Sequence, residues 1–133
     1  MLDTLKTIHS FWQYGVLIAA VVAIVGALAG WIGTLPPRLT ARRAGTIYII
    51  ALDIQLLLGA ALWLGRGGYG QLPQPFRLEH PLIMILAAVV AHVGQVLARR
   101  SKTPRAAARI VTIAVAVSLL LVVIGIPGLV RGR

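Results

Sequence analysis

The chain has 133 residues, of which 59% are hydrophobic, and its mean hydropathy is +0.90. A soluble domain of this length could not bury so much apolar surface, because its surface-to-volume ratio is too high. Thirteen Lys and Arg against three Asp and Glu give a net charge of +10, but the basic residues lie between apolar runs, which favours anchoring at a membrane surface over nucleic-acid binding.

Four apolar runs are long enough to cross a bilayer. The first occupies residues 10–33, and as a helix it spans about 35 Å, enough for a hydrocarbon core of about 30 Å. The others are predicted at residues 44–65, 79–98 and 106–130. Because hydrocarbon offers no hydrogen-bond partner to the backbone, the runs are expected to cross as helices. We therefore predict an all-α, single-domain transmembrane four-helix bundle, built from two hairpins.

Proline and glycine mark the connections between these runs. The Pro36-Pro37 pair ends the first run, since proline lacks the backbone donor that a helix interior needs. Glycine and proline are frequent from 65 to 81, which excludes regular structure through most of this segment. The Gly-Ile-Pro-Gly sequence at 125–128 breaks the last run.

The basic residues predict an orientation. The first and third connections share one side of the membrane and hold eight Lys and Arg, against five on the other side. The positive-inside rule then places these two connections in the cytoplasm and both termini in the periplasm of a bacterial inner membrane. The eight residues are Arg38, Arg42, Arg43, Arg99, Arg100, Lys102, Arg105 and Arg109.

Two histidines are expected at one level inside the bundle. His9 shares a helical face with Gln13, Val16, Ala20, Ala27 and Trp31, and His80 shares one with Met84, Ala87, Ala91 and Gly94. Small residues on both faces permit close helix approach. Facing imidazoles at one depth are what axial haem ligation needs, so His9 and His80 are candidate metal ligands; the alternative is that both are interfacial side chains bonded to water or lipid headgroups.

Glu79 precedes His80 and is a candidate site residue that would hydrogen-bond a ligand imidazole. Its carboxylate could orient an imidazole from a neighbouring helix, pair with Arg66 or Arg77, or remain solvated. A divalent-cation site made of His9, His80, Glu79 and Asp3 is a further reading, without diagnostic ligand spacing.

Four further polar residues fall within the apolar runs. An ionised Asp53 at mid-membrane would cost roughly 2.5–3.5 kcal/mol, so it is expected to be protonated, paired or in a wet cavity. His92, Gln95 and another subunit are its candidate partners, and Gln55 lies close by in sequence. His92 could serve a second haem, a quinone or a proton path; the alternative is that these polar residues only fix the helix packing.

Several short motifs resemble a family of small four-helix bacterial membrane proteins labelled cytochrome b-like. They are Ile8-His9-Ser10, the segment from Asp53 to Gly59, the segment from Phe76 to Pro81 followed by Met84, and Gly125-Ile126-Pro127. The resemblance covers nearly the whole chain and implies that His9 and His80 hold a b-type haem, with Glu79 beside them. Asp53 departs from the pattern, which has a histidine there; if that histidine is a ligand, this chain has lost it.

The motifs lead to three functional hypotheses. The first is a small electron-transfer protein or subunit with haem b, linked to quinone and without independent catalytic activity. The second is an accessory subunit without cofactor that stabilises a larger respiratory or photosynthetic complex by packing against its other membrane subunits. The third is a transporter or proton-conducting subunit that uses Asp53, His92 and Gln95.

Overall fold

The computed structural model describes residues 1–128, without the side chains of residues 38–40. Its elements, in chain order, are α1 (Leu2–Ile32), α2 (Pro37–Gly65), the single turn α3 (Gly68–Gln71), α4 (Glu79–Arg100) and α5 (Pro104–Gly125). The four long helices are each apolar and long enough to cross a membrane. The predicted all-α four-helix bundle is confirmed, and the chain is a multi-pass membrane protein whose apolar surface suits a lipid bilayer.

Three of the four long helices begin earlier than their apolar runs, and α4 begins at Glu79 as predicted. α1 begins at Leu2 rather than near residue 10, and α2 and α5 begin at Pro37 and Pro104 rather than at 44 and 106. Proline is favoured in the first turn because its fixed φ suits a helix and its missing N–H would have no partner there. Thr103 caps α5 by accepting a hydrogen bond from the Ala106 amide at 3.1 Å. The apolar runs therefore marked the membrane core rather than the helix ends.

One helix end agrees with the expectation and one differs. α1 ends at Ile32 with Gly33 as its cap, close to the predicted residue 33, and the Gly33 φ of 87° is the left-handed conformation that glycine adopts readily. α5 ends at Gly125 rather than at residue 130, because Pro127 biases the preceding Ile126 toward extended backbone. Residues 129 and 130, which were expected in the fourth span, lie outside the described part.

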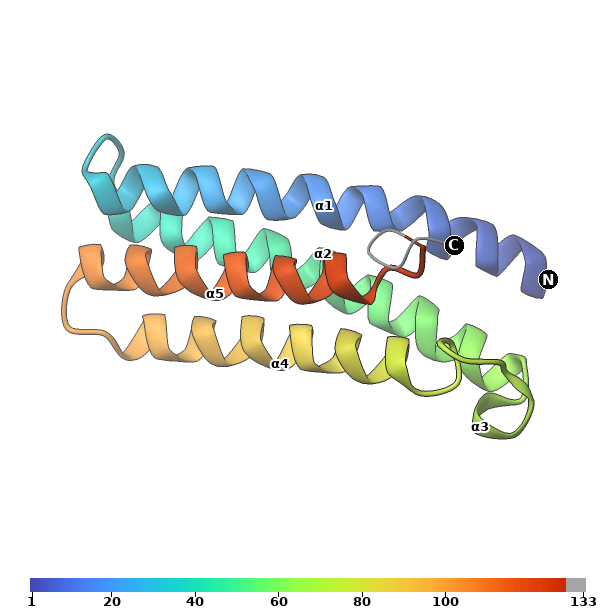
Figure 1. Cartoon of the computed structure of the whole chain (residues 1–133). Coiled ribbons are helices and arrows are strands. Elements are labelled where there is room, and N and C mark those ends of the chain that lie inside the picture. The colour runs from blue at the N-terminus through green and yellow to red at the C-terminus, as the bar shows by residue number, and fades with distance from the viewer. Residues whose placement is uncertain (129–133) are drawn as a thin grey trace.

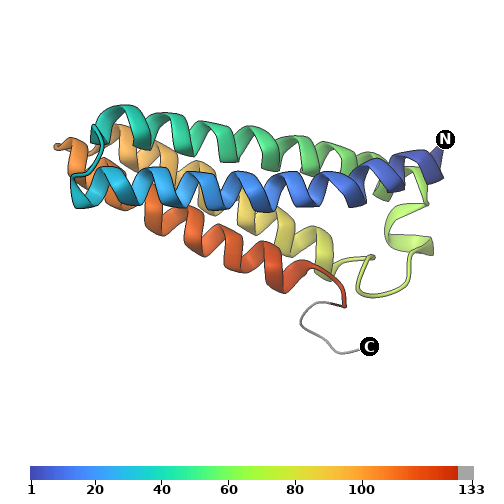
Figure 2. The ribbon, with the colours of Figure 1, turned by 90° about the horizontal axis from the view of Figure 1, so that it is seen from above.

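The two hairpins pack into one bundle (Figures 1 and 2). α1 packs along α2 and α4 along α5, and the hairpins meet through contacts of α5 with α1 and of α2 with both α4 and α5. In the described residues the backbones of α1 and α4 do not come within contact distance, so these helices occupy opposite corners. The two short connections lie at one end, and the start of α1 and the end of α5 face the other (Figure 1).

Small side chains fill the interior and large apolar side chains cover the outside. Most of each predicted inner face is confirmed: Val16, Ala20 and Ala27 of α1 are buried, as are the Met84, Ala87, Ala91 and Gly94 positions of α4. The other members of the two faces are half-buried: His9, Gln13, Trp31 and His80. Isoleucine, leucine and valine side chains are exposed along all four spans. Helix association in lipid depends on such close packing of small residues, because hydrocarbon surroundings give no hydrophobic driving force between helices.

The first hairpin is longer than the second. α1 has 31 residues and α5 has 22, which correspond to about 46 Å and about 33 Å of helix. The start of α1 and the end of α2 therefore project beyond α4 and α5 (Figure 1). The projecting ends contact each other, since Asp3 pairs with Arg66 at 3.3 Å. His9 lies almost two turns inside α1 for this reason, at the level where α4 begins.

Candidate functional site

His9 and His80 come together near the end of the bundle where α4 begins. Their ring centroids are 6.3 Å apart and the rings are nearly perpendicular, at 88°. The two residues belong to α1 and α4, which occupy opposite corners, so their side chains meet across the bundle at this level. The structure thus places the two predicted site histidines side by side, and both are half-buried.

The end of α5 orients the His80 ring. The Nδ1 atom of His80 lies 2.8 Å from the Gly125 carbonyl oxygen, one of the carbonyls that the end of a helix leaves without an intrahelical donor. A carbonyl only accepts, so Nδ1 carries the proton in this bond and Nε2 of the neutral ring keeps its lone pair. A Cβ at Gly125 would lie 2.9 Å from the branched side chain of Ile83 and against the flexible end of Met84, so glycine lets α5 end close against α4.

Gln55 and Gly59 of α2 form the surroundings of His9. The Gln55 side-chain amide donates to the His9 carbonyl oxygen at 3.0 Å. A Cβ at Gly59 would lie only 3.1 Å from His9 Cε1, so a glycine at this position makes room for the imidazole. Among the described residues, His9 Nδ1 and Gln55 Oε1 are buried without a hydrogen-bond partner. Buried polar atoms of this kind indicate a site for a bound group or an ordered water.

The ring separation of 6.3 Å and the angle of 88° are those of an edge-to-face contact. Both rings carry the nitrogen donors that a metal-centred cofactor would need. His80 already has the backbone hydrogen bond on Nδ1 that metal-bound histidines make, and it leaves Nε2 available. The haem that the sequence suggested is compatible with this donor pair.

A cation site with more ligands is not assembled. Within residues 1–128, no three His, Cys, Asp or Glu side chains lie close enough to hold one metal ion. Asp3, one of the four residues considered, pairs with Arg66 instead. Glu79 is the first residue of α4 and is half-buried beside His80, and its orienting role stays a prediction.

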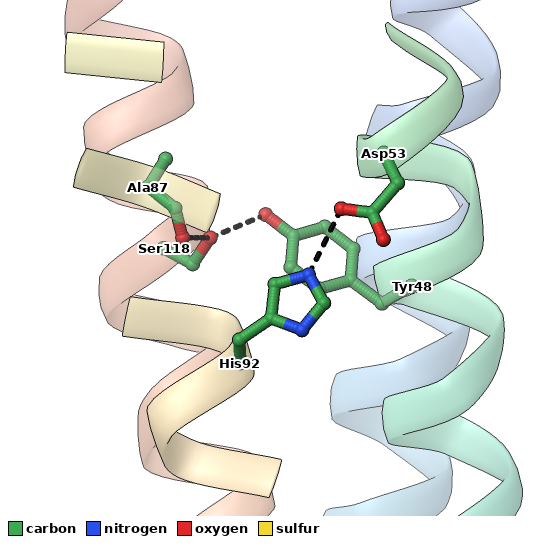
Figure 3. Close-up of polar contacts among 5 residues, drawn as sticks. All are labelled: Tyr48, Asp53, Ala87, His92 and Ser118. Atoms are coloured by element: carbon green, nitrogen blue, oxygen red, sulfur yellow. Dashed lines mark hydrogen bonds and ion pairs between the residues drawn. The ribbon is translucent and has the colours of Figure 1, made fainter. Parts of the chain in front are cut away.

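The four intramembrane polar residues separate into three places. Asp53 of α2 and His92 of α4 form a hydrogen bond of 2.9 Å, and their side chains are 43% and 51% exposed (Figure 3). Gln55 belongs to the histidine pair. Gln95 is buried, and its side chain packs where a Cβ of Gly45 would otherwise lie. Asp53, His92 and Gln95 therefore do not line one path through the bundle.

Sequence analysis missed the polar contact at the centre of the bundle. Tyr48 is fully buried, and its hydroxyl lies 2.8 Å from Ser118 Oγ, which donates to the Ala87 carbonyl oxygen at 2.7 Å (Figure 3). The only hydroxyl proton of Ser118 is used toward Ala87, so Tyr48 donates to Ser118. In the sequence, the only indication of this contact is that Tyr48 and Ser118 are polar residues within apolar runs.

Comparisons with protein families, curated proteins and solved structures gave no match to this chain. The class of the protein therefore follows from its fold: it is a multi-pass membrane protein with four spanning helices and a pair of facing histidines at one end of the bundle.

Proposed function

We propose that the chain is a small cytochrome b-like electron-transfer protein or subunit in which His9 and His80 hold a b-type haem and which exchanges electrons with quinone. The observation that carries this proposal is the histidine pair: two imidazoles from opposite corners of the bundle, 6.3 Å apart at one level. A haem bound there would supply one-electron redox chemistry.

The chain's own residues would prepare this site in three ways. The Gly125 carbonyl fixes the tautomer and orientation of His80. Gln55 holds the backbone of His9, and Gly59 leaves room for its ring. The orphaned Nδ1 of His9 is a donor or acceptor that a bound group would satisfy. The position where the resembling family has a third histidine is occupied here by Asp53, which bonds His92 instead.

An optical spectrum of the purified protein, oxidised and reduced, tests the proposal. We expect a Soret band that is lost in His9→Ala and in His80→Ala. His92→Ala is the matched control, because it removes the remaining histidine of the chain from a different site, and it should retain the band. A full Soret band in both ligand variants, or a colourless wild-type protein produced with sufficient haem, would reject the assignment.

The Asp53–His92 pair favours a second candidate function, that of an accessory subunit without cofactor in a larger respiratory or photosynthetic complex. Both side chains are about half exposed on a face that lipid would otherwise cover. A polar helix of another subunit would shield them better than hydrocarbon does. Stoichiometric copurification with a colourless complex, lost in the double variant Asp53→Leu/His92→Leu, would support this function over the first.

We also infer a bacterial inner-membrane location, with the two short connections in the cytoplasm and both termini in the periplasm. The basis is the excess of basic residues around those two connections. Both connections lie at the same end of the bundle (Figure 1).

A further inference from the structure

A cavity of about 530 Å³ opens at the end of the bundle that carries the two short connections. We call it the basic-end cavity. It is formed by α2, α4, α5 and the connection between α4 and α5. Three cationic side chains line it, those of Arg42, Arg99 and Lys102, together with the hydroxyl residues Ser101 and Thr103. The cavity lies at the opposite end from His9 and His80, so it is a separate site.

The cations of this cavity have no carboxylate of an Asp or Glu near them. The sequence has three acidic side chains, and two of them, Asp3 and Glu79, begin helices at the other end of the bundle. The third, Asp53, lies about 16 Å along α2 from Arg42 and bonds His92. No acidic side chain of the described residues therefore balances the positive charge at this end.

The walls below the cations are mostly small and apolar. Ala98, Ala107 and Val111 line the cavity on α4 and α5 together with the buried amide of Gln95, and large exposed aliphatic side chains continue along the same helices. A phosphate group satisfies clustered Arg, Lys and hydroxyl donors, and an acyl chain fits the apolar surface beneath. Free phosphate would contact only the polar part of the cavity and leave its apolar walls uncovered. The cavity also lies where the membrane-spanning helices end, which is the depth of lipid headgroups.

We propose that the basic-end cavity binds the headgroup phosphate of an anionic phospholipid, with Arg42, Arg99 and Lys102 as its ligands. The Thr103 hydroxyl, which accepts from the Ala106 amide, keeps its own proton for a remaining phosphate oxygen, whereas the Ser101 hydroxyl already donates to the Ala98 carbonyl oxygen. The apolar walls hold the upper part of an acyl chain. This binding would anchor the ends of α2, α4 and α5 to one leaflet.

The test uses the purified full chain in neutral detergent. Native mass spectrometry compares retention of phosphatidylglycerol with that of phosphatidylcholine carrying the same acyl chains. A second arm compares the unfolding temperature in phosphatidylglycerol with that in inorganic phosphate. The variant Arg42→Gln/Arg99→Gln removes two cavity ligands. Arg43→Gln/Arg100→Gln removes the same charge from their sequence neighbours, which are exposed like Arg42 and Arg99 but do not line the cavity.

We expect wild-type protein to retain phosphatidylglycerol preferentially and to be stabilised by it more than by phosphate. The cavity variant should lose about tenfold or more in affinity and the neighbour variant clearly less, because attraction to an anionic surface alone depends on total charge. Equal losses in both variants would overturn the proposal. Equal retention of the two lipids, or equal protection by phosphate, would also overturn it, and these comparisons hold even if the cavity variant does not fold.

Discussion

Asp53 on α2 and His92 on α4 form a hydrogen bond of 2.9 Å on the outer face of the bundle, where both side chains remain about half exposed (Figure 3). The pair joins the two hairpins along a boundary where α2 and α4 are in contact. In hydrocarbon, Asp53 and His92 satisfy each other's hydrogen-bonding groups, because no water is available there to do so.

The Asp53–His92 bond is expected to contribute measurably to the stability of the bundle. A double-mutant cycle of Asp53→Leu and His92→Leu should give a coupling energy of about 0.6–1.7 kcal/mol, the range for polar pairs between helices in lipid. The double variant should be more stable than the sum of the single changes predicts. The measurement is the free energy of unfolding in mixed micelles.

The control cycle uses Ile54→Ala and Val93→Ala, which alter the same exposed surface without polar atoms. These changes should be additive. A coupling energy for Asp53 and His92 that is no larger than the control value would contradict the role of the pair.

The contact between Tyr48 and Ser118 predicts an asymmetry between two conservative variants. Ser118→Ala leaves the buried Tyr48 hydroxyl without an acceptor and should lower the free energy of unfolding by about 1–3 kcal/mol. Tyr48→Phe leaves Ser118 bonded to the Ala87 carbonyl and should cost less, about 0.5–1.5 kcal/mol. Thermal unfolding of both variants provides the comparison, and a larger loss in Tyr48→Phe would mean that the hydroxyl direction is wrong.

Close packing of α4 on α5 depends on Gly94. A Cβ at this position would collide with that of Ala114, so Gly94→Ala should destabilise the bundle by about 1–3 kcal/mol through overpacking. Gly26→Ala is the control, since its Cβ would meet the nearest atom, Ala44 Cβ, at an ordinary 3.7 Å and its helix propensity would improve. Equal stability of the two variants in a denaturation assay would show that the helices can separate at Gly94 without cost.

Single cysteines can test the proposed orientation, because the chain has no cysteine of its own. Thr34→Cys lies in the first connection and Gly70→Cys at the opposite end of the bundle, and both positions are exposed. In cells with a permeabilised outer membrane, an impermeant maleimide should label Gly70→Cys directly and Thr34→Cys only after the inner membrane is opened. The reverse pattern would place the basic end outside.

The fold could be predicted from the sequence because its cause is local. A run of apolar residues must satisfy its backbone within itself in hydrocarbon, so four runs gave four spanning helices. The small-residue stripes through Ala20 and Ala87 also gave the inner faces correctly, since helical periodicity is a property of each segment alone. The ends were less accurate: Pro37 and Pro104 extend two helices beyond the apolar runs.

The candidate site was predicted only in part. His9 and His80 were expected at one level, and the structure brings their rings together. His92 was one of the candidate partners of Asp53, and the structure pairs the two. Gln55 is two residues from Asp53, which turns it about 200° around the helix, so it contacts His9 instead. The role of the Gly125 carbonyl at His80 had no signal in the sequence, because it depends on where α5 ends relative to α4.

The sequence by itself determined that this chain lies in a membrane, how many times it crosses, and that one end is strongly basic. Only the tertiary structure decided which polar side chains bond each other: Asp53 with His92, and Tyr48 with Ser118. It also decided that Arg42 and Arg99 line one cavity. Hydrophobic burial in lipid and backbone hydrogen bonding act within a segment. The pairing of side chains depends on how each helix is rotated and how closely its neighbours approach, and that is set by packing between segments.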